Sequence, residues 1–416
     1  MSTYCFLTSE FMPSADASGI CVYNLSKELI KNDHKVIVIC EGQNGEHRFY
    51  EGIEVYEVKP SILKYWRTRS IRSKKKLDFF ITECIKHLRR LVRIITLFSF
   101  PDVSPLRTKK EYKLLTKIHK QHSLDYVIGA FRPYEGIGAI NRFKRKKTKV
   151  CSIALYWDLI RGKNPFGQRL YKLFDYLCYK SEKLTFSLND KILIPQSGKI
   201  TYDTDRFSFV KEKIEYFDFP VFTQNHTSSS NIISGTNDEI NLMCIGTIDG
   251  KNRSAQYFLQ LVKELNLKVK QNIQVHIVGE FNDIKTYEEF KNESFVNFHG
   301  VVDYKDIPGF IEKADFLINI ANKETYDMIP SKIFQYFVSC KPIINFVAHE
   351  KDKSLEYFNK YPLKCNIFEY KNNIDEDAIS LENYLFNTKF ITLNYLQVEA
   401  LYQSSTPEYF IKKFLI

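Results

Sequence analysis

The sequence contains no apolar run of the roughly 18 residues that a membrane-spanning helix needs, and the longest candidate, residues 91–100, is interrupted by Arg93. Glycine (16 residues) and proline (13 residues) are scarce and 44% of the chain is hydrophobic, which excludes a disordered chain. Its nine cysteines form no C-x-x-C pair and lie mostly in apolar stretches. This pattern predicts reduced core cysteines in a cytosolic protein, without a disulfide framework or a metal site. The opening MSTYCFLTSEFMP meets Glu10 and Pro13 too early for a signal peptide.

The length of 416 residues predicts two domains, and the hydrophobic pattern divides the chain in the same way. In the first half, apolar runs predict strands at 3–8, 35–40, 52–58, 125–129, 149–155 and 191–194, with a helix at 19–31 and further helices between them. The polar stretch 223–238, TQNHTSSSNIISGTND, predicts a linker. Strands are then predicted at 241–245, 273–278, 295–298, 316–320 and 342–346, with helices near 254–265, 305–313 and 331–337. This alternation predicts an α/β fold with two doubly wound parallel sheets, which bind ligands at the carboxyl ends of their strands.

The net charge of +11 is distributed unevenly. Residues 1–225 contain 40 Lys and Arg against 24 Asp and Glu, whereas residues 226–416 contain 20 against 25. Within residues 59–98, the stretch FFITECIKHLRRLVRIITLF predicts a basic amphipathic helix that binds an anionic membrane surface. The alternative is a helix packed on its own sheet with a solvated basic back. No nucleic-acid recognition motif is present, so a nucleic-acid partner is not expected.

Four segments, in order along the chain, resemble the retaining glycosyltransferases of the GT-B fold, specifically family 4. They are FLTSEFMPSADASGICVYNLSKELIKNDHKVIVIC, CIGTIDGKNR, FHGVVDYKDIPGFIEKADFLINIA and YDMIPSKIFQYFVSCKPIINF. The resemblance covers nearly the whole length and implies two Rossmann-like domains facing a cleft. It implies an acceptor-facing domain at 1–222, the linker at 223–238, a nucleotide-sugar-binding domain at 239–395 and a C-terminal helix at 396–416 that returns to the first domain.

The last of these segments is where the family carries its donor-binding motif of two Glu residues separated by seven positions. Here the corresponding residues are Asp327, which we expect to accept hydrogen bonds from sugar hydroxyls, and Gln335, which we expect to reach the ribose. Pro330 and Ser331 predict a helix N-terminus whose free N–H groups face the diphosphate. Glu324 is a substitute if the alignment is shifted. The alternative is an ordinary helix with solvent-facing polar groups, or a degenerate donor site.

Family members neutralise the diphosphate with an Arg and a Lys after the first strand of the second domain. Thr247 stands where the Arg is common, so Arg253 and Lys251, after Gly246, become the candidates, with Lys332 as a third. A fixed cation is needed because charge develops on the leaving nucleoside diphosphate, and Arg can bind it through two hydrogen bonds. Each of these residues could instead be a solvated loop charge.

In the first domain, the resemblance implies two further site residues. Gly19 would permit close approach of a phosphate or an acceptor, or else serve a tight turn. Asp158 lies where the family often has a catalytic-site His or Asp, and would orient the acceptor or stabilise the transition state, or else cap a helix.

The resemblance implies a metal-independent hexosyl- or N-acetylhexosaminyl-transferase that takes a sugar from a UDP- or GDP-linked donor, with no other cofactor. The implied acceptor is a lipid-linked saccharide of envelope polysaccharide biosynthesis, and the implied location is cytoplasmic, on the inner face of the cell membrane. Two alternatives remain. One is a GT-B sugar-nucleotide epimerase, and the other is a non-catalytic partner subunit with a decayed donor site.

Overall fold

The computed structural model describes residues 1–13, 15–42, 45–61, 64–66, 84–85, 87–88, 99–131, 133–146, 148–160, 170–223, 239–303, 306–326, 329–330 and 332–416. The chain forms two compact units, one comprising Met1–Val221 with Pro407–Ile416 and the other Phe222–Thr406. The predicted return to the first unit at 396 is therefore too early, because residues 396–406 belong to the second unit.

The first unit is built on an eight-stranded sheet with the order β3-β4-β2-β1-β5-β6-β7-β8. All neighbouring strands are parallel except β3 and β4, so the predicted parallel sheet has one antiparallel edge pair. The strands are β1 (Thr3–Leu7), β2 (Lys35–Glu41), β3 (His47–Tyr50), β4 (Ile53–Val58), β5 (Tyr126–Phe131), β6 (Cys151–Tyr156), β7 (Lys191–Pro195) and β8 (Ile214–Phe217). The central strands are buried on both faces, which explains their continuous apolar runs.

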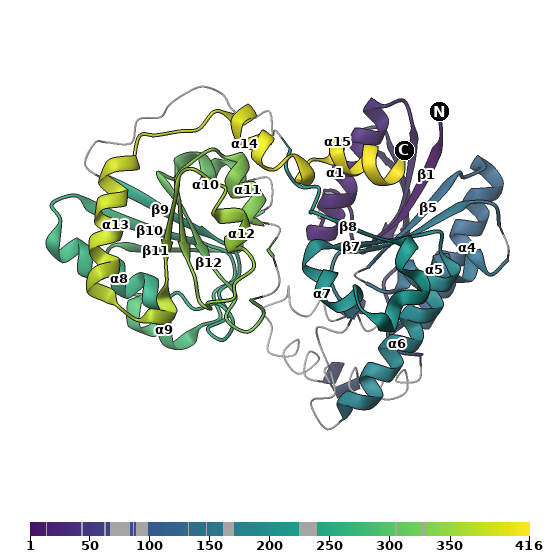
Figure 1. Cartoon of the computed structure of the whole chain (residues 1–416), viewed down its shortest axis with the longest axis horizontal. Coiled ribbons are helices and arrows are strands. Elements are labelled where there is room, and N and C mark those ends of the chain that lie inside the picture. The colour runs from purple at the N-terminus through teal and green to yellow at the C-terminus, as the bar shows by residue number, and fades with distance from the viewer. Residues whose placement is uncertain are drawn as a thin grey trace. The chain divides into compact units, whose positions relative to one another are not determined.

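Helices cover both faces of this sheet (Figure 1). The helix α1 and the C-terminal segment lie on one face, where they contact each other, and α4, α5 and α6 lie on the other. The helices of this unit include α1 (Ala17–Lys31), α4 (Pro105–His122), α5 (Glu135–Lys144), α6 (Tyr171–Leu188), α7 (Lys199–Tyr202), α15 (Pro407–Phe410) and the final π-helical turn Ile411–Leu415. The last turn is held to the sheet because Tyr4 donates to the Leu415 carbonyl (3.2 Å) and Lys191 donates to the Phe414 carbonyl (3.1 Å).

The second unit is built on a six-stranded parallel sheet with the order β11-β10-β9-β12-β13-β14. The strands are β9 (Glu239–Ile245), β10 (Asn272–Val278), β11 (Val296–Gly300), β12 (Phe316–Ile320), β13 (Ile343–Phe346) and β14 (Lys364–Ile367). The helices are α8 (Gln256–Lys268), α9 (Ile284–Phe290), α10 (Ile307–Lys313), α11 (Lys332–Val338), α12 (Leu355–Phe358), α13 (Ile374–Thr388) and α14 (Tyr395–Leu401). In Figure 1, α8 and α13 cover one face of the sheet, and α11 and α12 cover the other.

Every strand named from the sequence is present within a few residues of its predicted bounds. The sequence did not reveal β3, β8 and β14, which are short strands at or near sheet edges. The predicted helix at 331–337 is α11, but it begins at Lys332, and Pro330 precedes it. None of the helices within the described residues is long and apolar enough to cross a membrane.

A group of charged side chains is buried at the carboxyl end of β2, beside α4 and α5. Arg107 of α4 donates to Glu111 (2.7 Å) and to Glu41 at the end of β2 (2.5 Å). Glu135, the first residue of α5, is buried nearby, and its Oε2 has no hydrogen-bond partner among the described residues. Burial raises the pKa of Glu111 to about 7, although the Arg107 guanidinium opposes this rise, and burial also raises the pKa of Glu135. The group therefore contains more carboxylates than its buried arginine can neutralise.

We expect Glu111→Gln to stabilise the protein more at pH 8 than at pH 5. Because the pKa of Glu111 is about 7 in the folded state and 4.5 is its unshifted value, the unfolded state loses this proton first as pH rises. As pH rises from 5 to 8, the free energy of unfolding of the wild type therefore falls by about 1 to 3 kcal/mol, and that of the variant does not. Urea unfolding from pH 5 to 8 measures the difference, with the exposed Glu264→Gln of α8 as the control. A difference that does not change with pH would show that Glu111 ionises normally in the folded state.

Candidate functional site

Three neighbouring strands of the second sheet end in glycines with positive φ angles: Gly246 after β9 (131°), Gly279 after β10 (134°) and Gly300 at the end of β11 (68°). The Gly246 amide donates to the Val278 carbonyl (2.8 Å). A Cβ atom added to Gly279 would lie 2.4 Å from the Gly246 carbonyl oxygen, so this crossing requires glycine. At these three glycines, the carboxyl edge of the sheet is therefore lined by backbone atoms. Parallel sheets bind ligands at this edge.

The helix α11 places a cation directly over the end of β9. Lys332 donates from Nζ to the Ile245 carbonyl (3.1 Å), and one turn later the Tyr336 hydroxyl accepts from the Ile245 amide (3.0 Å). These side chains share one face of the helix because they are four residues apart. A Cβ atom added to Gly246 would lie 3.0 Å from the Lys332 Nζ, so the glycine makes room for the ammonium group.

A second cation, Arg253, comes from the loop that follows β9. Its Nε donates to the Oδ1 of Asn322 (2.8 Å), a buried residue after β12. Burial and, to a smaller extent, the nearby Arg253 guanidinium lower the pKa of Lys332 to about 8. Burial also lowers the pKa of Arg253. Among the described residues, neither cation forms a salt bridge. The nearby Asp249 carboxylate offsets part of the charge on Arg253, and the Lys332 ammonium has no hydrogen bond to a carboxylate.

The backbone amides of the same loop are already occupied. Asp249 Oδ1 accepts from the amides of Lys251 (3.0 Å), Asn252 (2.7 Å) and Arg253 (3.0 Å). A phosphate cannot use these N–H groups while the carboxylate holds them. Binding of an anion at this edge therefore depends on the side chains of Arg253 and Lys332.

Asn252 links this loop to the segment after β12. Its Nδ2 donates to Asn322 Oδ1 (3.1 Å) and Thr325 Oγ1 (3.2 Å), and its Oδ1 accepts from the Glu324 amide (2.8 Å). This amide side chain thereby fixes the position of the neighbouring Arg253. No pattern in the sequence indicates this role for Asn252, because its partners lie some 70 residues further along the chain.

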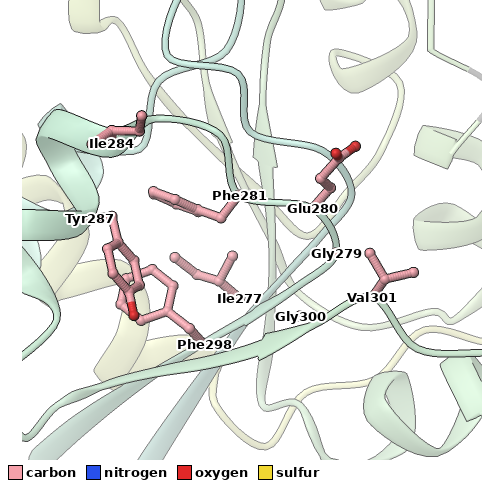
Figure 2. Close-up of a pocket in the computed structure, with 9 residues that line it drawn as sticks. All are labelled: Ile277, Gly279, Glu280, Phe281, Ile284, Tyr287, Phe298, Gly300 and Val301. Atoms are coloured by element: carbon pink, nitrogen blue, oxygen red, sulfur yellow. The ribbon is translucent and has the colours of Figure 1, made fainter. Parts of the chain in front are cut away.

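A cavity of about 400 Å³ opens beside the glycines of β10 and β11. Its lining residues are Ile277, Gly279, Glu280, Phe281, Ile284, Tyr287, Phe298, Gly300 and Val301. Figure 2 shows three aromatic side chains gathered on one side, while the carboxylate of Glu280 points away from them. The ring centroid of Phe298 lies 5.0 Å from those of both Phe281 and Tyr287. This pocket is mainly apolar and lies next to the end of β9, because Gly279 contacts Gly246.

The structure brings together three of the residues predicted for diphosphate binding, namely Gly246, Arg253 and Lys332. Lys251 does not join them, because it is exposed and forms an ion pair with Glu324 (3.1 Å). The described part of α11 starts at Lys332, and the Pro330 carbonyl accepts from the Ile333 amide (3.2 Å), so the predicted diphosphate contact at this helix N-terminus stays a prediction.

Of the remaining candidates in this segment, Gln335 is partly buried in α11, and its predicted contact with a ribose stays a prediction. Asp327 and Ser331 lie outside the described residues. The described part of the helix supplies the side chain of Lys332 to the end of β9.

The two candidates of the first unit lie in local arrangements of their own. A Cβ atom on Gly19 would lie 2.2 Å from the Glu10 carbonyl oxygen, and the Gly19 amide donates to Asp16 Oδ1 (2.9 Å). The group that comes close to Gly19 is thus the Glu10 backbone, and the Asp16 carboxylate already accepts from the N-terminus of this helix. Asp158 follows β6, is partly buried and accepts from the Leu159 amide (2.8 Å), and its catalytic role stays a prediction.

Within the described part of the chain, no three His, Cys, Asp or Glu side chains come together in a way that could hold a metal ion. The arrangement at the end of β9 instead offers two fixed organic cations beside an aromatic pocket. Such a site can bind an anionic group joined to a flat or apolar one.

No profile of a known protein family matches the chain, and no curated protein matches it in sequence. Solved structures nevertheless match along almost its whole length. Sucrose-phosphate synthase from Thermosynechococcus elongatus matches with a TM-score of 0.61 at 11% identity, covering 98% of this chain and 96% of that one. HepE from Anabaena in complex with UDP and glucose matches with a TM-score of 0.54 at 11% identity, covering 100% of this chain and 99% of that one. The lipopolysaccharide outer core galactosyltransferase WaaB matches with a TM-score of 0.52 at 11% identity, covering 99% of this chain and 98% of that one. The chain therefore has the GT-B fold, which confirms the fold expected from the sequence.

We expect Lys332→Met to stabilise the ligand-free protein at pH 7 and to lose this advantage as pH approaches 10. The folded wild type carries a buried charge below pH 8 and sheds it before the unfolded chain does, so its stability rises between about pH 8 and 10.5. The difference in unfolding free energy between Lys332→Met and the wild type should change by about 1 to 3 kcal/mol from pH 7 to pH 10. Urea unfolding at pH 7 and pH 10 measures it. The exposed Lys263→Met of α8 serves as the control, and an equal response of both variants would contradict the prediction.

Proposed function

We propose that the chain is a glycosyltransferase that uses a nucleoside diphosphate sugar as its donor. The observation that carries this proposal is the pair of partly buried cations, Arg253 and Lys332, at the carboxyl end of β9 without a carboxylate partner among the described residues. Holding two positive groups together in this way costs stability unless an anion joins them. A diphosphate supplies that anion, and it is also the leaving group whose charge must be stabilised during transfer.

The pocket beside Gly279 supports the nucleotide as the other half of this donor. An aromatic base fits a mainly apolar cavity lined by Phe281, Tyr287 and Phe298. The pocket lies next to the cation pair because Gly279 and Gly246 are in contact, so one molecule can occupy both places. HepE from Anabaena, which shares the fold, was solved with UDP and glucose.

Retention of the anomeric configuration is part of the proposal and rests on the resemblance to family 4. In that chemistry the leaving phosphate takes the proton of the acceptor hydroxyl, so no strong protein base is required. Arg253 and Lys332 would stabilise the charge on that phosphate. Asp158 in the first unit would orient the acceptor.

The cation pair argues against the alternative of a partner subunit with a decayed donor site. Burial disfavours the charged state of both Lys332 and Arg253, and the Arg253 guanidinium adds to that cost for Lys332. Without a ligand to bind, replacing either residue by a neutral one would stabilise the protein. A site that keeps such a costly arrangement is better explained by binding.

Thermal unfolding with UDP, GDP, ADP and CMP, and with their common sugar conjugates, tests the donor. We expect a selective rise in Tm with one nucleotide family, equivalent to about 2.7 kcal/mol at a ligand concentration 100 times its Kd. Arg253→Gln should abolish the rise, because the remaining lysine cannot neutralise the diphosphate alone, whereas Lys263→Gln on α8 should keep it.

Activity is then followed as release of the nucleoside diphosphate from the donor that shifts Tm. Release that depends on an added saccharide acceptor and is lost in Arg253→Gln supports a transferase. Interconversion of the donor sugar without release would support the epimerase instead. A protein that responds to none of these donors would contradict the proposed function.

We further propose that the acceptor is carried on a lipid and that the first unit binds the anionic inner face of the cell membrane. The basic segment 59–98 supports this by its charge, although it lies largely outside the described residues. The first turns of α6 add an exposed apolar surface of Leu170, Tyr171, Leu173 and Tyr176, with Lys172 among them. Aromatic and aliphatic side chains beside lysine suit the interface of an anionic bilayer.

Binding to vesicles tests the membrane proposal. We expect the protein to co-sediment with phosphatidylcholine vesicles that contain phosphatidylglycerol, and to bind pure phosphatidylcholine weakly. Tyr171→Ser with Tyr176→Ser should lower the affinity about tenfold, because two exposed aromatic side chains are lost from the surface. The control is Phe390→Ser with Ile391→Ser after α13, which removes a similar exposed pair. Equal loss in both double variants would contradict a specific surface on α6.

A further inference from the structure

Two stacked rings lie further along the same sheet edge, at the ends of β12 and β13. Tyr326 follows β12 and His349 follows β13, and their ring centroids lie 4.0 Å apart with an interplanar angle of 8°. The two loops are also joined by a backbone hydrogen bond, from the Lys353 amide to the Tyr326 carbonyl (2.9 Å). The stack is therefore held in place by both segments.

The order of the strands places this stack beyond the cation pair. The aromatic pocket lies at β10 and β11, the cations lie at β9, and β12 and β13 follow on the other side. Neighbouring strands are about 4.8 Å apart, so β13 is roughly 10 Å from β9. A nucleotide sugar is an elongated molecule with the base at one end, the diphosphate in the middle and the sugar at the other end. With the base in the pocket and the diphosphate on the cations, the sugar extends toward β12 and β13.

The hydrogen bonds of His349 determine what its ring can offer. Its Nδ1 accepts from the Lys351 amide (3.0 Å), so the neutral imidazole carries its proton on Nε2. Stacking on Tyr326 fixes the plane of the ring. The ring of the partly buried His349 makes no other hydrogen bond among the described residues, and its carbonyl accepts from the Asp352 amide (3.1 Å). The Nε2–H group is thus a donor that is oriented in advance.

We propose that His349 is a sugar-recognition residue, which donates a hydrogen bond from Nε2 to an oxygen of the transferred sugar while Tyr326 holds its ring. The inference rests on the proposed function, because it needs the donor to lie along this edge. It assigns the selection of the sugar to the loops after β12 and β13. Binding of the nucleotide and binding of the sugar are then separable properties of the site.

The test compares each nucleoside diphosphate with its sugar conjugate by isothermal titration calorimetry, using UDP with UDP-glucose and GDP with GDP-mannose. His349→Phe keeps a ring that can stack on Tyr326 but removes both nitrogens. We expect it to weaken binding of the sugar conjugate about 5- to 10-fold and to leave the free diphosphate unchanged. His349→Gln, whose side-chain amide can donate, should restore part of the loss.

His34 in the first unit provides a matched control. Its Nδ1 also accepts from a backbone amide, that of Ser2 (3.1 Å), and its ring also contacts a tyrosine, Tyr4 (5.3 Å between centroids). His34→Phe should therefore share any general effect on folding but change neither affinity. Equal weakening of diphosphate and conjugate in His349→Phe, or no change in either, would overturn the inference alone. A wild-type protein that binds none of UDP, GDP, ADP and CMP or their sugar conjugates would overturn the proposed function, and this inference with it.

Discussion

The burial of two cations, Arg253 and Lys332, at the end of one strand is the constraint on which the candidate site depends. Two positive groups beside the end of a buried strand are unfavourable, and the surrounding structure holds them there. Tyr336 and Lys332 fasten α11 to the last residue of β9, and Asn322 holds the guanidinium from the other side. The protein thereby holds an electrostatic cost that the proposed anionic ligand would relieve, which is the usual physical basis of a preorganised binding site.

Backbone geometry makes the rest of that edge accessible. Glycines end β9, β10 and β11, and at Gly279 and Gly246 a side chain would collide with a neighbouring strand or with the ammonium group. Because these loops carry no side chains at the crossing points, the aromatic pocket and the cations lie close together. The strand order then continues to the stacked rings of Tyr326 and His349, so the proposed base, diphosphate and sugar positions follow one another along a single sheet edge.

The first unit shows that net charge does not describe local electrostatics. Its half of the sequence carries a large excess of Lys and Arg, yet the end of β2 buries a group in which carboxylates outnumber the arginine. The surplus positive charge is therefore available at the surface, as the proposed contact with an anionic membrane requires. The buried group instead makes the stability of this unit depend on pH, because Glu111 titrates near neutrality.

The sequence by itself determined the α/β alternation and nearly all of the strands, because apolar periodicity is a local property. Its resemblance to family 4 added Arg253 and Lys332 as candidates. It could not determine which candidates meet. Lys332 reaches the end of β9 across 87 residues of chain, and Lys251, only two positions from Arg253, turns instead to an exposed pair with Glu324. Contacts of that range depend on how strands are ordered in the sheet and on which face of a helix is buried. The tertiary structure alone decided the cation pair, the link through Asn252 and the stack of His349 on Tyr326.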